Sequence, residues 1–172
     1  MECQGGLFAP STSLKQKGKR MIKRLQLSKK DQVSGLVEFL KHSYSPDFYF
    51  TKNNQRIYIE TEKHLRQLVK ECKEIWISDE GAGITGIIVL WTASGGNIKR
   101  NYVKMAAKNG IAADKLLTVL LWNYNKETFI KINKKSTFLR LFYQKGYKFL
   151  SGRGKQLLLK RNRYIIKSRK RN

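Results

Sequence analysis

The residues of this chain best placed for chemistry lie at a turn, Asn109-Gly110, that opens a helix. Both residue types tolerate the backbone angles of a tight turn, and the apolar run that follows has helical spacing. The first N–H groups of a helix lack partners within it and the helix dipole adds positive potential, so such a turn suits a phosphate group. One interpretation is therefore a diphosphate site for a nucleotide-like cofactor, and the other is a plain connecting turn.

The elements around this turn alternate between strand and helix. Residues 101–107 and 128–132 predict two strands, and the helix between them has an apolar stripe formed by Leu116, Leu117, Val119, Leu120, Leu121 and Trp122. We expect Asp114 in the first turn of that helix, where a carboxylate favours the helix dipole. A second helix ends at Gly146, and one face of it is formed by Leu139, Phe142 and Tyr143. This order predicts a parallel βαβ unit.

The loop at residues 107–112 (AKNGIA) resembles motif A of the GNAT superfamily, the acyl-CoA-dependent N-acyltransferases. In that family a strand enters an Arg/Gln-x-x-Gly-x-Gly/Ala loop that opens a helix. Gly110 and Ala112 match this pattern, whereas Ala107 stands at the Arg/Gln position, so the loop is a degenerate version. The resemblance implies an acetyl-CoA or other acyl-CoA site formed by Val103, Met105, Lys108, Asn109, Gly110, Ile111, Ala112, Ala113 and Ser136.

Residues 136–147 (STFLRLFYQKGY) resemble a second GNAT motif, Asn-x-x-Ala-x-x-x-Tyr followed by Glu-Lys-x-Gly-Phe. Tyr143 matches the tyrosine, while Ser136 and Leu139 stand where Asn and Ala are usual. The resemblance implies that Tyr143 is the catalytic acid that protonates the departing thiolate. An aromatic packing role is equally compatible with Tyr143, as a helix N-cap role is with Ser136.

A catalytic base is harder to find in the sequence. The strand before the loop has no carboxylate; Asp79 and Glu80 fall in a predicted hairpin loop, and Tyr102 offers at most a relay through water. His42 and His64 are isolated, so we interpret both as surface or boundary residues and predict no metal site. A neutral amine acceptor needs no base, so catalysis is not excluded.

The aromatic residues outside these motifs have structural interpretations. Three tryptophans fall within apolar periods and are predicted in the core: Trp76, Trp91 and Trp122. Residues 48–50 (FYF) follow a proline outside any clear helix. The favoured interpretation is that these aromatic side chains pack beneath their loop. The alternatives are that they line an acceptor groove or stack on nucleobases.

Charge is the strongest compositional feature: 36 basic and 12 acidic residues give a net charge of +24. No acidic residue follows Glu127, whereas 15 Lys or Arg lie between Lys131 and Arg171. Such polarity predicts a polyanion partner, DNA or RNA, bound through the basic termini without sequence specificity. A solvated lysine-rich surface is the alternative. No apolar run is long enough for a membrane span, and Cys3 and Cys72 are interpreted as reduced thiols.

The element order along the chain predicts a single α+β domain. A strand, two helices and a hairpin precede the βαβ unit, and a final hairpin around residues 151–154 follows it. We predict a flexible basic arm (1–19), a GNAT-like domain with a mixed central sheet flanked by helices (20–160), and a basic tail (161–172). Ser28 is the expected N-cap of the first helix and Thr61 that of the second.

Two functions follow. The first is a GNAT-type N-acyltransferase that moves an acetyl or other acyl group from acyl-CoA to an amine, on a basic, polyanion-binding protein. The alternative is a non-catalytic GNAT-like protein that binds nucleic acid or serves in a virion. The reduced cysteines and missing signal sequence predict a cytoplasmic location, with virion or nucleoid association as further options.

Overall fold

The computed structural model describes residues 21–42, 48–53, 55–81, 83–95 and 97–163. The strands are β1 (Met21–Arg24), β2 (Tyr49–Lys52), β3 (Gln55–Tyr58), β4 (Cys72–Asp79), β5 (Ile84–Gly95), β6 (Ile98–Ala107), β7 (Thr128–Asn133), β8 (Lys148–Arg153) and β9 (Gln156–Arg161). The helices are α1 (Lys30–His42), α2 (Glu62–Glu71), α3 (Gly110–Asn123) and α4 (Leu139–Gln144). The arm predicted at 1–19 and most of the predicted tail, 164–172, lie outside the described residues.

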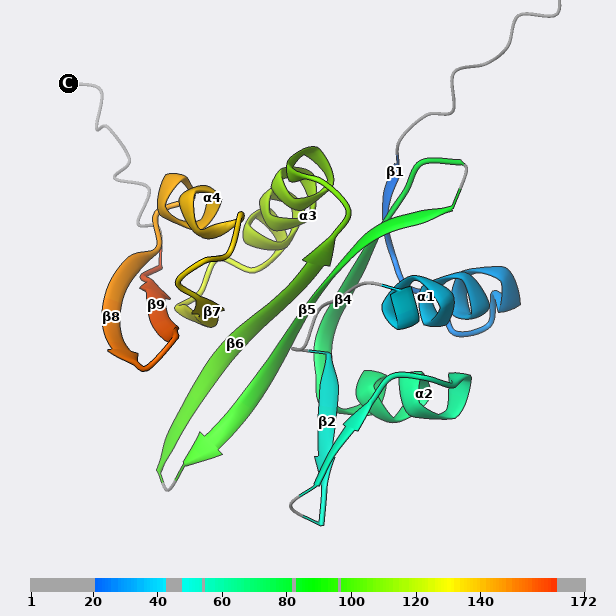
Figure 1. Ribbon diagram of the computed structural model, residues 1–172, viewed down its shortest axis with the longest axis horizontal. Coiled ribbons are helices and arrows are strands. Elements are labelled where there is room, and N and C mark those ends of the chain that lie inside the picture. The colour runs from blue at the N-terminus through cyan, green and yellow to red at the C-terminus, as the bar shows by residue number, and fades with distance from the viewer. Residues whose placement is uncertain (1–20, 43–47, 54, 82, 96, 164–172) are drawn as a thin grey trace, which may run out of the picture.

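Seven strands form one mixed sheet in the order β1-β4-β5-β6-β7-β9-β8, and β2 and β3 form a separate hairpin (Figure 1). Neighbouring strands of the large sheet are antiparallel except β6 and β7, which run parallel. Helix α3 connects these two strands. The predicted βαβ unit and the α+β class with a mixed central sheet are therefore confirmed.

The two faces of the sheet have separate cores. Along β5, Ile87 and Val89 pack with α1 and α2, whereas Ile88 and Leu90 pack with α3 and α4. Figure 1 shows these helix pairs on opposite sides of the sheet. Because β5 is covered on both faces, its sequence is an almost continuous apolar run instead of an alternating one. Of the described helices, none is long and apolar enough to cross a membrane.

Several local predictions are confirmed. The Thr61 hydroxyl accepts a hydrogen bond from His64 N at 3.2 Å and caps α2. Gly146 ends α4 with a φ of 85°, a conformation that favours glycine. The strands β4 and β5 form the expected hairpin, as do β8 and β9, although the second turn lies at Gly154-Lys155, after residues that remain in the strand.

Other local predictions are wrong. Trp122 is 86% exposed, because at about 100° per residue it falls on the side of α3 opposite the buried face that includes Leu116 and Leu120. Asp114 lies in the second turn of α3, which begins at Gly110, and its carboxylate pairs with Lys145 Nζ at 2.8 Å. Ser28 is not the N-cap of α1, since that helix begins two residues later, at Lys30.

Candidate functional site

Strands β6 and β7 separate soon after they meet. They pair only at Tyr102–Phe129 and Val103–Ile130, although both strands continue beyond these pairs. Beyond Val103 the two strands diverge, and in the described part of the chain no strand covers the β7 side of β6 there. This gap leads directly to the turn at Asn109-Gly110 where α3 begins.

A cavity of about 1540 Å³ occupies the gap and extends to both sides of the sheet. Its lining comes from β6, β7, the start of α3 and the turn before α4, and across the sheet from α1, α2 and β2. Single-ligand sites usually measure roughly 300–1,000 Å³, so this cavity has room for two reactants.

The cavity lining carries a surplus of positive charge, from Arg56, Lys104, Lys108, Lys131 and Lys135. Two carboxylates, those of Glu38 and Glu71, lie on the side formed by α1 and α2. Three of the lysines form no ion pair within the described part of the chain: Lys108, Lys131 and Lys135. Their charge is thus available to an anion that enters the cavity.

The first turn of α3 begins at the edge of this cavity, where Asn109 and Gly110 line it. The Asn109 side-chain oxygen accepts from Ala112 N at 2.8 Å, and its carbonyl oxygen accepts from Ala113 N at 3.1 Å. The N–H groups of Gly110 and Ile111 have no partner among the described residues. A Cβ added at Gly110 would meet no atom within 4 Å, so the backbone there is open to close approach.

The residues predicted to bind a cofactor divide into two groups. Those that line the cavity are Val103, Met105, Lys108, Asn109, Gly110 and Ser136. Three others do not: the side chain of Ile111 is largely exposed, and Ala112 and Ala113 are buried against the sheet. The Ser136 hydroxyl accepts from Phe138 N at 3.3 Å, so it stabilises the turn before α4 instead of capping that helix. For all nine residues, a role in cofactor binding stays a prediction.

The aromatic side chain of α4 that lines the cavity is Phe142, whereas the sequence analysis proposed Tyr143. Phe142 lines it and is 1% exposed, whereas Tyr143 is 44% exposed and is absent from the lining. The Phe142 ring packs edge-on against Tyr147 at 5.3 Å between centroids. The Phe142 side chain has no hydroxyl and cannot donate a proton. The acid role of Tyr143 stays a prediction.

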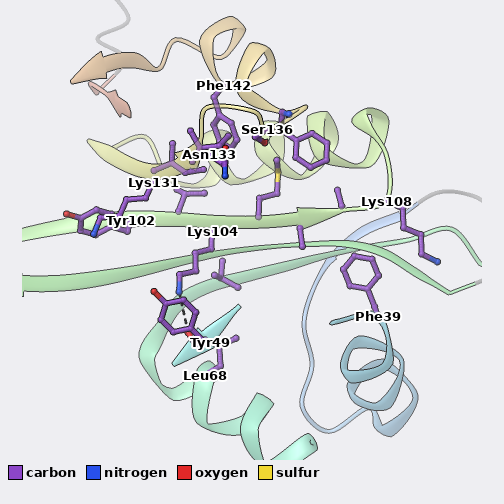
Figure 2. A pocket seen from close by; sticks show the side chains of 18 of the residues that line it. Phe39, Tyr49, Leu68, Tyr102, Lys104, Lys108, Lys131, Asn133, Ser136 and Phe142 are labelled. Atoms are coloured by element: carbon purple, nitrogen blue, oxygen red, sulfur yellow. Dashed lines mark hydrogen bonds between the residues drawn. The ribbon is translucent and has the colours of Figure 1, made fainter. Parts of the chain in front are cut away.

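Lys104 is a partly buried cation of the cavity, and its side chain points towards Tyr49 (Figure 2). Its Nζ donates to the carbonyl oxygen of Tyr49 at 3.3 Å, and it lies 4.2 Å from the Tyr49 ring centroid and 4.9 Å from that of Trp91. Burial raises the pKa of the neighbouring Cys72 thiol to about 12; Glu71 adds to the rise, and Lys104 opposes it. At this end of the cavity the thiol is therefore protonated at neutral pH.

Sequence reasoning missed the polar residues that α1 and α2 bring to the cavity: Glu38, His42 and Glu71. His42 Nε2 lies 3.1 Å from Glu38 Oε1, an i,i+4 pair that helical spacing alone would have indicated. Asp79, one of the carboxylates weighed as a base, is instead bound by Lys23 and by Gly81 N, and both interactions lower its pKa. It does not line the cavity.

Comparison with solved structures identifies the architecture. A GNAT-family acetyltransferase from Streptococcus pneumoniae superimposes with a TM-score of 0.61 at 10% identity, over 83% of this chain and 98% of the other. An N-acetyltransferase from Thermoplasma acidophilum, in complex with coenzyme A, gives 0.54 at 13% identity over 85% and 99%. The fold is that of the GNAT acetyltransferases. No family model and no curated protein matches the sequence.

The Thermoplasma acidophilum structure contains coenzyme A, and the residues that line the present cavity are compatible with such a ligand. CoA carries a diphosphate and a further phosphate, which suit the surplus of lysines and the open N–H groups of Gly110 and Ile111. Gly110 in particular leaves the space that an approaching diphosphate needs. Acyl-CoA would supply the activated acyl group as a thioester; the chain would supply binding and positioning.

Proposed function

We propose that this protein is an N-acyltransferase that transfers an acetyl or other acyl group from acyl-CoA to an amine. The separation of β6 and β7 carries this proposal, because it leaves a cavity that joins the start of α3 to the opposite face of the sheet. Acyl-CoA would bind with its phosphates at Lys108 and Gly110, and the amine would approach from the side of α1 and α2.

Isothermal titration calorimetry with acetyl-CoA tests the binding step. We expect saturable binding that weakens about tenfold or more in the charge-reversal variant Lys108→Glu, a loss of about 1.4 kcal/mol. Lys63→Glu, on the exposed face of α2, is the matched control and should bind normally. Absence of binding at millimolar acetyl-CoA would rule the proposal out. Release of free CoA with a panel of amines then tests transfer.

A second candidate is a GNAT-like protein that binds a polyanion without catalysis. Phe142 favours it, since α4 presents a ring without a hydroxyl to the cavity, and so does the net charge of +24. Binding of acetyl-CoA without release of free CoA across the amine panel would favour this candidate over the first.

A further inference from the structure

Lys104 lies at the point where the gap between β6 and β7 begins. Val103 is the last residue of β6 that pairs with β7, and Lys104 follows it directly. Figure 2 shows its side chain directed towards Tyr49, on the opposite side of β6 from Ser136 and Phe142. A group that passes through the gap from the α3–α4 side therefore reaches Lys104 as it emerges on the other face.

The Lys104 amine is held at this position instead of moving through solvent. Its side chain is half-buried, its Nζ bonds to the Tyr49 carbonyl oxygen, and two aromatic rings flank it. The other lysines of the cavity, Lys108 and Lys131 among them, are exposed. An amine fixed beside a bound electrophile reacts at a high effective concentration, whereas exposed lysines rely on random encounters.

We propose that Lys104 is an internal acyl acceptor, whose Nζ takes the acyl group from acyl-CoA bound in the cavity. This inference rests on the proposed function. The ammonium first loses one proton to water through the open cavity. Nζ then forms a bond with the thioester carbonyl carbon and the C–S bond breaks. The nitrogen loses a second proton, which passes through water to the CoA thiolate. The products are an N-acyl-lysine, free CoA and the one proton released by the ammonium.

Acylation of Lys104 has a structural consequence. The amide that forms carries no charge, so Lys104 loses its cation–π attraction to the rings of Tyr49 and Trp91, and only the Arg56 guanidinium, 4.8 Å from its centroid, still faces the Tyr49 ring. The cation–π interaction and the hydrogen bond between Lys104 and Tyr49 connect the β2–β3 hairpin to the central sheet. The modified protein should therefore hold this hairpin less firmly against the acceptor side of the cavity, which changes access for other amines.

Peptide mass mapping over time tests the proposal on the unmodified protein. After incubation with acetyl-CoA, we expect Lys104 to gain an acetyl group about tenfold or more faster than exposed lysines such as Lys63 and Lys148. Free CoA should slow the reaction by competition. Acetic anhydride, which needs no CoA site, should show no preference for Lys104, and neither should acetyl-CoA with the protein unfolded in urea.

Two variants and one parallel measurement separate the outcomes. Lys104→Arg should abolish the fast acetylation, whereas Lys63→Arg should leave it intact. Calorimetry on the same preparation reports whether acetyl-CoA binds; without binding, the proposed function and this inference both fail. With binding and transfer to added amines, but Lys104 modified no faster than Lys63, the internal-acceptor inference alone is wrong.

Discussion

A substitution at Gly110 should weaken acetyl-CoA binding without lowering the stability of the fold. Its φ is not in the left-handed region and an added Cβ would meet nothing, so the fold itself does not need glycine there. Gly110→Ala should leave the thermal midpoint unchanged or raise it slightly, since alanine restricts the unfolded chain by about 0.4–1 kcal/mol. The methyl group would instead occupy the space proposed for the diphosphate. We expect acetyl-CoA affinity to fall about tenfold by calorimetry; a variant that binds normally would contradict the proposed site.

Tyr147 makes stability sensitive to alkaline pH. Burial raises its pKa from an ordinary value of about 10 to about 12, against the lowering effects of the Thr128 hydroxyl and Arg161. Because the folded-state pKa is the higher one, the stabilisation is complete below pH 10 and is lost as pH rises towards 12. The loss amounts to roughly 2–3 kcal/mol. Cys72, with its pKa raised from 9.0 to about 12, acts in the same direction from pH 9 upward.

Urea unfolding between pH 8 and pH 12 measures this loss. Tyr147→Phe should remove part of the alkaline decline, and it should cost about 1 kcal/mol at neutral pH because the buried Thr128 hydroxyl loses its partner. Tyr143→Phe is the matched control, since that phenol is exposed, and it should keep the full decline. Equal pH profiles for the two variants would show that Tyr147 is not responsible.

At the scale of elements, substitution by alanine should have opposite effects on stability at two glycines, one in β5 and one in α1. A Cβ at Gly86 would lie 2.7 Å from Leu116 Cδ1 and 3.1 Å from the Ala106 carbonyl oxygen, between β5, β6 and α3. Gly86→Ala should therefore destabilise the protein by about 1–3 kcal/mol. Gly35→Ala, inside α1, meets only Ile84 at 3.7 Å and should stabilise by about 0.5–1 kcal/mol. Thermal unfolding of both variants checks the contrast, which equal shifts would contradict.

The elements themselves were largely predictable, whereas the direction of single side chains was not. The βαβ unit, the Thr61 cap and the final glycine of α4 follow from local patterns. Helix α4 has only six residues, too few for a periodicity to fix which face is inward. Its rotation is set by packing against β7 and β9, which buries Phe142 and exposes Tyr143.

The carboxylates on the α1–α2 side of the cavity were not predictable from local sequence patterns, whereas a groove lined by residues 48–50 was one of the interpretations of the sequence. Glu38 and Glu71 reach the cavity because α1 and α2 pack on the same face of the sheet as Lys104. Tyr49 reaches it through the β2–β3 hairpin, which pairs with no strand of the large sheet. These positions depend on packing between segments far apart in the chain, which propensity and periodicity do not specify.

At the scale of the whole molecule, charge is distributed by element. The strands β7, β8 and β9 and helix α4 contain no acidic residue, whereas half of the 12 acids lie between Glu60 and Glu80, around α2 and β4. Exposed basic side chains on the β8–β9 hairpin include Lys148, Arg153 and Lys155. The resulting field should draw any polyanion to this side of the molecule, and CoA to the cavity beside it.

Salt dependence tests whether this charge binds phosphates. If phosphates bind along β8–β9, the affinity for double-stranded DNA should fall steeply with salt, with a log–log slope of about −0.9 for each neutralised phosphate. Filter binding at salt concentrations from about 50 to about 200 mM measures that slope. Reversing the charge of Lys148 and Lys155 should reduce the slope by about one for each lysine that binds a phosphate. Lys63→Glu, within the acidic region, should leave it nearly unchanged. An affinity that does not vary with salt, or equal slopes in all variants, would show that the basic side is only a solvated surface.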